Sequence, residues 1–189
     1  MKKNNQPVFS LVLVAMFASL TAIGAFIKIP TPIVPFTLQV MFVFLAGCLL
    51  GSRQGALSQI VYVGTGLVGF PVFVSGGGLT YIFQPTFGYL LGFISAAYVI
   101  GKLVERKKNP SIKTFFIANM SGLVCVYLCG VIYLYISLNM WIDQPTSLWK
   151  VLVMGFFTSI VADILIGIGA SVVAVRLYRL FKYKKVVNA

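Results

Sequence analysis

The chain is a succession of long apolar segments that carry almost no charged residues. Of its 189 residues, 59% are apolar and 10% are charged, whereas soluble globular domains are about half apolar and about a quarter charged. A helix needs roughly 20 apolar residues to cross a bilayer, so six such helices would use about 120 positions. Little of the chain is then left for a soluble catalytic domain. The sequence therefore predicts an integral membrane protein.

We expect an all-α integral membrane protein with six transmembrane helices and both termini in the cytoplasm. The expected spans are about Val8 to Ile27, Leu38 to Leu50, Gly55 to Phe70, Pro85 to Val104, Phe115 to Leu138 and Leu148 to Leu177. The second and third are short for a full crossing, so they should tilt or bury their ends against neighbouring protein. Residues 1–189 then form a single six-helix membrane domain with a basic tail from about residue 178.

The orientation follows from the distribution of Lys and Arg. The positive-inside rule assigns the loops that are rich in cations to the cytoplasm. Of the fifteen Lys and Arg residues, only Lys28 and Lys150 fall on the other side. Because membrane topology explains the formal charge of +12, we expect a lipid bilayer, and no nucleic acid, as the partner of these cations. The outward connections are then residues 29–36, 71–84 and 139–147.

The outward connections differ in composition from the cytoplasmic ones. They contain Pro, Gly, Thr, Asn, Gln and aromatic residues, which suit a lid over a small molecule with little or no charge. For the prolines, tight turns are an equally good interpretation. For residues 76–81 we favour function, because three successive glycines allow a close approach of the backbone and a simple turn needs one.

Several kinds of chemistry are absent from the sequence. Without any His and with only three acidic residues, the chain offers no nucleophilic triad and no metal-ligand cluster, so we expect no catalytic and no metal site. There is no phosphate-binding loop of the G-x-x-x-x-G-K-[ST] type, so nucleotide hydrolysis is not expected. Cys48, Cys125 and Cys129 lie within apolar runs and are interpreted as small apolar residues.

Asp163 is the polar residue that most needs an explanation. It lies near the middle of the sixth span, where a charged side chain costs roughly 2.5 to 3.5 kcal/mol on insertion scales. Contact with a ligand or ion is the favoured interpretation, and a structural hydrogen bond is the alternative. Asn119 and Gln39 are amides within apolar helices, which often form interhelical hydrogen bonds. Tyr89, near the outer end of its span, suits either stacking on a ligand or interfacial anchoring.

Four alanines in the first span are spaced so that they share one helix face. Ala15, Ala18, Ala22 and Ala25 follow one another at intervals of three, four and three residues. Such a stripe allows another helix to approach closely. That helix could belong to a partner subunit or to the same bundle.

A set of short motifs adds a family resemblance over most of the chain from Ala15 to Ala170. The motifs are Pro35–Gln39, Leu45–Gly51, Gly55–Ser58, Gly69–Phe73, Gly76–Gly78 and Pro85–Phe93. In their order and spacing they resemble the biotin-specific substrate-binding (S) component of energy-coupling-factor (ECF) transporters, the BioY family. The resemblance implies a high-affinity S component that captures biotin outside a bacterial cytoplasmic membrane. Its partners would be a transmembrane coupling subunit and two ATP-binding cassette subunits.

The resemblance also implies roles for individual residues. Ala18 and Ala22 would contact the coupling subunit, together with the rest of the alanine stripe. Asp163 is similar to the acid of an Asp-x-x-Lys pattern, but Ile166 stands where the family has Lys, so the carboxylate of biotin has no assigned cation. Backbone N–H groups near residues 76–80 or outer-loop hydroxyls are candidates. Apart from biotin as the transported ligand, no cofactor is expected. The candidate binding residues are Phe36, Gln39, Gly77, Gly78, Thr80, Gln84, Thr86, Tyr89, Asn119 and Asp163.

Two other functions remain open at this point. The first is a stand-alone secondary transporter in which Asp163 carries a proton or cation, although the two halves of the chain show no internal repeat. The second is a scaffold that organises other membrane proteins through the alanine stripe. Uptake by this chain alone would favour the first, and binding of a small ligand would count against the second.

Overall fold

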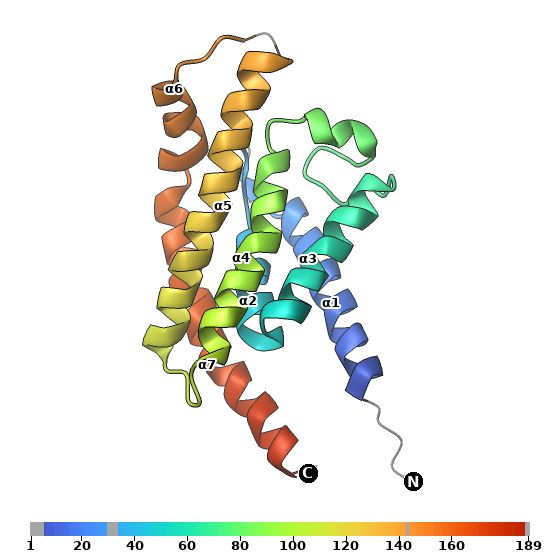
Figure 1. The fold of residues 1–189 in the computed structure, drawn as a ribbon, viewed down its shortest axis with the longest axis vertical. Coiled ribbons are helices and arrows are strands. Elements are labelled where there is room, and N and C mark those ends of the chain that lie inside the picture. Colours follow the sequence, from blue (N-terminus) through green and yellow to red (C-terminus); the bar gives the residue numbers. More distant parts are fainter. Residues whose placement is uncertain (1–5, 30–33, 143, 188–189) are drawn as a thin grey trace.

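The computed structural model describes residues 6–29, 34–142 and 144–187, which form a bundle of helices (Figure 1). In chain order the elements are α1 (Gln6–Phe26), β1 (Lys28–Ile29), β2 (Phe36–Thr37), α2 (Gln39–Leu50), α3 (Ser52–Leu67), η1 (Leu79–Phe83), α4 (Phe87–Glu105), α5 (Ile112–Met140), α6 (Leu148–Leu152), η2 (Val153–Phe157) and α7 (Ile160–Val187). The prediction of an all-helical architecture is confirmed, apart from two short strands.

Within the described residues, four helical segments are long and apolar enough to cross a membrane. They are Val8–Phe26, Phe87–Glu105, Ile112–Met140 and Leu148–Leu180. The two short spans foreseen in the sequence correspond to α2 with 12 residues and α3 with 16 residues. At a rise of 1.5 Å per residue they reach about 18 and 24 Å, less than the roughly 30 Å of a hydrocarbon core. A multi-pass helical protein is therefore established, and six crossings remain a prediction.

α4 is the central helix of the bundle and packs against α2, α3 and, most extensively, α5. Small residues make the α4–α5 contact close: a Cβ atom on Gly92 would lie 2.8 Å from the Cα atom of Val126. On its other faces α5 exposes Val124, Leu128 and Ile132. An exposed apolar face of this kind suits contact with lipid. The bundle thus has a tightly packed interior and an apolar exterior.

The turn between α2 and α3 is fixed by α4. Gly51 has a φ of 84°, a conformation that L side chains rarely adopt, and it leads directly into Ser52 at the start of α3. The Glu105 carboxylate, at the end of α4, accepts hydrogen bonds from the backbone N–H and the hydroxyl of Ser52, both at 2.8 Å. This acceptor satisfies a backbone donor that a helix start leaves without an intrahelical partner. The α2–α3 hairpin is therefore held against α4 at this end.

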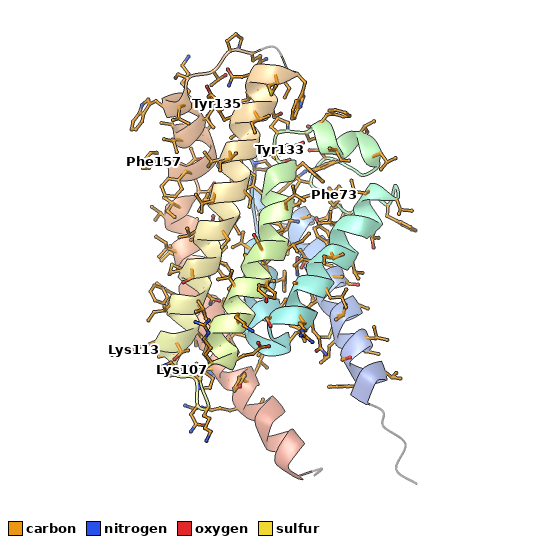
Figure 2. The ribbon with its side chains drawn as sticks, viewed as in Figure 1. Phe73, Lys107, Lys113, Tyr133, Tyr135 and Phe157 are labelled. Atoms are coloured by element: carbon orange, nitrogen blue, oxygen red, sulfur yellow. The ribbon has the colours of Figure 1, made fainter. Side chains whose placement is uncertain are left out.

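The two ends of the bundle differ in chemistry. Figure 1 shows the α2–α3 turn, the α4–α5 connection and the C-terminal part of α7 at its lower end, and η1 and the start of α6 at its upper end. Lys107 and Lys113 lie at the lower end, whereas Phe73, Tyr133 and Tyr135 lie toward the upper end (Figure 2). Cation-bearing segments that are far apart in the chain therefore meet at one end. The assignment of this end to the cytoplasm remains a prediction.

The sixth expected span contains a π-helical turn. Its sequence predicts one helix over residues 148–177, but the structure has α6, then the π-helical turn η2, and then α7 from Ile160 onward. A π-helical turn takes in more than 3.6 residues per turn and disturbs the regular pattern of backbone hydrogen bonds. Within it the carbonyl of Gly155 accepts a hydrogen bond of 2.8 Å from the Tyr89 hydroxyl. The predicted helix of the sixth span is present as one apolar helical segment, Leu148–Leu180. It contains a π-helical turn that the sequence does not indicate, and Asp163 follows this turn near the start of α7.

A short antiparallel hairpin follows α1. β1 pairs with β2 so that Lys28 is opposite Thr37 and Ile29 is opposite Phe36. The sequence gives only an outward connection here, without strands. Residues 30–33 of that connection, with Pro30 and Pro32, lie outside the described residues. The hairpin places Phe36 and Thr37 directly before the start of α2.

Candidate functional site

A pocket lies between the hairpin, α2, α4, α5 and the segment that contains η2 and the start of α7. The volume that the centres of water molecules can occupy in it is about 60 Å³. A single water needs roughly 10–15 Å³ of such volume. The pocket therefore holds only a few waters in this conformation. Its lining residues are Val34, Pro35, Phe36, Thr37, Gln39, Val40, Val74, Tyr81, Thr86, Tyr89, Leu90, Phe93, Val126, Tyr127, Gly155, Ser159 and Asp163.

Asp163 is the only acidic residue of this lining and is 5% exposed. Its Oδ2 atom accepts a short hydrogen bond from the Tyr127 hydroxyl. Its Oδ1 atom is buried and has no hydrogen-bond partner among the described residues. The site thus presents a buried acceptor with unused hydrogen-bonding capacity, which is costly unless a ligand or water satisfies it.

A chain of hydrogen bonds positions Gln39 at the pocket. Its amide oxygen accepts from the Thr37 hydroxyl at 3.1 Å, and its amide nitrogen donates to the Tyr62 hydroxyl at 2.6 Å. Tyr62 in turn donates to the carbonyl of Val72 at 3.1 Å. The chain joins the hairpin, α2, α3 and the connection before η1. Gln39 is therefore held in one orientation by residues of the hairpin and of α3.

Aromatic and aliphatic side chains form the remaining walls. The rings of Tyr89 and Tyr127 meet edge to face with centroids 6.4 Å apart, and Leu90, Phe93 and Val126 complete this side. At the mouth, the hydroxyls of Tyr81 and Thr86 are 3.3 Å apart. Burial raises the pKa of Tyr81 above its ordinary value, so its hydroxyl stays protonated at neutral pH. The walls suit a neutral, mostly apolar ring system.

Five of the ten predicted binding residues line this pocket: Phe36, Gln39, Thr86, Tyr89 and Asp163. The other five do not line it. Asn119 is buried deeper in the bundle, where it donates to the Ser171 hydroxyl at 3.0 Å and accepts from the Cys48 thiol at 3.3 Å. These hydrogen bonds connect α2, α5 and α7. Gly77, Gly78, Thr80 and Gln84 belong to the connection above the pocket.

Other lining residues were not foreseen in the sequence. Tyr127 is the most informative, because it holds Asp163. A tyrosine in an apolar helix can equally well face lipid, so the sequence does not indicate that Tyr127 lines the pocket. Phe93, Leu90 and Val126 are likewise ordinary apolar residues until α4 and α5 are packed together. Gly155 lies in the π-helical turn η2, and Ser159 lies shortly after it.

The alanine stripe of α1 lies at the edge of the bundle and is divided. Ala18 and Ala25 are buried within the chain itself, at 7% and 0% exposed. Ala22 is half-buried and Ala15 is exposed. A helix from another subunit would therefore meet Ala15 and Ala22 before the other two.

One cation lies beside the pocket without lining it. The Lys28 ammonium donates a hydrogen bond of 2.8 Å to the carbonyl of Val74, and Val74 is a lining residue. No Lys or Arg occurs among the residues described for the lining. In the described part of the chain, no three His, Cys, Asp or Glu residues come together as metal ligands.

Long apolar helices packed around a pocket with one buried acid are typical of a multi-pass membrane protein. A sequence profile of the BioY family matches residues 1–183. The chain belongs to the BioY family.

Individual relatives agree with this assignment. The chain is 54% identical over 183 residues to a probable biotin transporter of Lysinibacillus sphaericus, with 97% of this chain and 93% of the relative covered. It is 37% identical over 171 residues to a biotin transporter of Thermotoga maritima, with 90% and 96% covered. The crystal structure of an S-component for biotin from an ECF-type ABC transporter is similar, with a TM-score of 0.78, 26% identity and 95% of each chain covered.

Proposed function

We propose that this chain is the subunit that captures biotin for an ATP-driven uptake transporter of the ECF type, and that biotin binds in the pocket around Asp163. Family membership and the names of the relatives support the ligand. The similar crystal structure supports the role of an S component. The observation that carries the site assignment is the unpartnered Oδ1 atom of Asp163 in a lining that is otherwise neutral.

The chemistry of biotin fits this lining. Its cyclic urea presents two N–H donors, and a carboxylate offers only acceptors. The Oδ1 atom of Asp163 therefore supplies the acceptor that one of these N–H groups requires, while the fused rings contact Tyr89 and Phe93. Tyr127 holds the carboxylate in place through the opposite oxygen. On this basis Asp163 recognises the urea, and the aromatic walls recognise the rings.

Binding requires the lining to move. The present pocket has room for a few waters, whereas a bicyclic ligand with a side chain needs several times that space. The hairpin and the connection that carries η1 both contribute lining residues, and loops are the parts of a fold that rearrange at lowest cost. Capture therefore includes opening and closing of these two segments.

The proposal also includes the membrane topology of the chain and its partner subunits. The chain would cross the cytoplasmic membrane of a bacterium six times, with both termini inside, as the cation distribution indicates. It would work with a coupling transmembrane subunit and two ATP-binding cassette subunits, and these partners would hydrolyse ATP. The exposed edge of the alanine stripe, Ala15 and Ala22, would contact the coupling subunit.

A calorimetric titration of the detergent-purified chain tests the function. We expect biotin to bind at one site per chain and thiamin and riboflavin to leave that binding unchanged, because neither supplies a cyclic urea for Asp163. If biotin does not bind to folded protein, the proposed function is wrong. Binding of all three vitamins with similar affinity would contradict the assignment of the pocket to biotin.

One observation favours the alternative of a secondary transporter. Secondary transporters place disturbed helices beside intramembrane ion sites, and the π-helical turn η2 lies just before Asp163, within a helix that continues through it. Reconstitution into vesicles separates the two functions. Uptake by this chain alone that an ionophore abolishes would support the alternative, whereas uptake that needs ATP and the partner subunits supports the S component.

A further inference from the structure

The proposed ligand carries an acid group for which the pocket provides no cation. Biotin has a carboxylate at the end of its side chain, opposite the urea. Transfer of a carboxylate from water into a protein costs free energy unless a partner pairs with its charge. No Lys or Arg is described in the lining. We propose that Lys28, at the rim of the pocket, binds the carboxylate of the ligand. This inference rests on the proposed function.

The hairpin places Lys28 beside the pocket. In the β1–β2 register Lys28 is directly opposite Thr37, which lines the pocket and donates a hydrogen bond to Gln39. On its other side the Lys28 ammonium reaches the carbonyl of Val74, a second lining residue. Lys28 therefore lies between two lining residues, and its ammonium is hydrogen-bonded directly to one of them.

The ammonium has capacity for a ligand. It carries three N–H donors, and its described hydrogen bond, to Val74, uses one of them. The residue is exposed, so a ligand carboxylate replaces water at the ammonium without burying an unpaired charge. Exposure also means that the contact is of moderate strength and is weakened by salt.

The positions of Lys28 and Asp163 together match the ligand. Asp163 is a buried acceptor within the bundle, and Lys28 is a cationic donor at the rim. Biotin has donors at its ring end and an acid at its tail end. The two protein groups therefore define the direction in which the ligand lies, with the urea inward and the acid outward. Lys150, the other outward cation, lies on α6 and shows no described hydrogen bond to the lining.

A comparison of two ligands tests this role. The probes are biotin and biotinamide, in which a neutral amide replaces the carboxylate, and the variants are Lys28→Met and Lys28→Arg. For Lys28→Met we expect about fivefold weaker binding of biotin, the size of an exposed ion pair, and unchanged binding of biotinamide. Lys28→Arg should retain most of the affinity for biotin. Lys150→Met is the matched control and should bind both ligands like the parent chain.

The possible results separate the role of the charge from a structural role. Lys28→Met also loses the hydrogen bond to Val74, and a purely structural effect would weaken both ligands equally. Such an equal loss would overturn the inference, as would unchanged binding of biotin. Added salt should weaken the binding of biotin to the parent chain more than to Lys28→Met. If the parent chain does not bind biotin at all, the proposed function fails instead.

Discussion

Replacement of Asp163 tests the binding site at the residue on which it most depends. Asp163→Asn keeps the size of the side chain and one acceptor oxygen but removes the charge. Hydrogen bonds to charged groups contribute about 1.5 to 3 kcal/mol, and each 1.4 kcal/mol is about a tenfold change in affinity. We therefore expect Asp163→Asn to bind biotin about tenfold to a hundredfold more weakly. Asp163→Leu offers no acceptor and should bind more weakly still.

The comparison needs a control for stability, because Asp163 also accepts a hydrogen bond from Tyr127. Asn119→Ala is suitable: it removes buried hydrogen bonds to Cys48 and Ser171 but leaves the pocket lining intact. We expect it to lower the thermal stability of the ligand-free protein while the folded fraction binds biotin with the parent affinity.

The measurements are isothermal titration calorimetry for affinity and thermal unfolding without ligand for stability. A folded Asp163→Asn protein with unchanged affinity would show that Asp163 has a structural role only. Weakened binding by Asn119→Ala, in protein whose folding is verified, would show that affinity follows the stability of the bundle and not contact with Asp163.

Three further predictions concern the frame around the site. Glu105→Gln should lower the free energy of unfolding by about 1 kcal/mol, the typical value of a helix cap, because the backbone N–H and hydroxyl of Ser52 lose a charged acceptor; an unchanged thermal midpoint would contradict this. Ala15→Leu should prevent co-purification with the coupling subunit and preserve biotin binding, whereas Ala25→Leu, at a fully buried position, should lower stability; the reverse pattern would place the partner elsewhere. In a variant without native cysteines, Leu79→Cys should react with an impermeant thiol reagent on intact cells and Lys107→Cys should not. Labelling of Lys107→Cys alone would show that the orientation is the reverse of the predicted one.

Much of the helical framework could be predicted from the sequence, because apolar runs bounded by Gly, Pro and charge fix where helices begin and end. The second span was expected at about residues 38–50, and α2 covers Gln39–Leu50. The π-helical turn within the sixth span could not be predicted. Its residues contain no proline, and the π-helical turn is accompanied by the contact of Gly155 with Tyr89, 66 residues away in the chain.

The site could be predicted only where a residue conflicts with the bilayer. Asp163 stands out because a carboxylate in an apolar helix needs a partner. Asn119 has the same signal and a different role, because an amide is satisfied by neighbouring helices, and here Ser171 and Gly167 of α7 provide them. Tyr127 gives no signal at all. Its role depends on the close packing of α5 against the first turn of α7, and a single sequence does not show how helices pack.

The small volume of the pocket has a consequence for the rate of capture. A ligand that enters only after the hairpin and the η1 connection have moved binds at a rate limited by that movement, so the observed rate levels off as the ligand concentration rises. Closure of the same segments slows escape once the ligand is inside. A substitution that loosens the hydrogen bond between Lys28 and Val74 would then shorten the residence time and accelerate binding together.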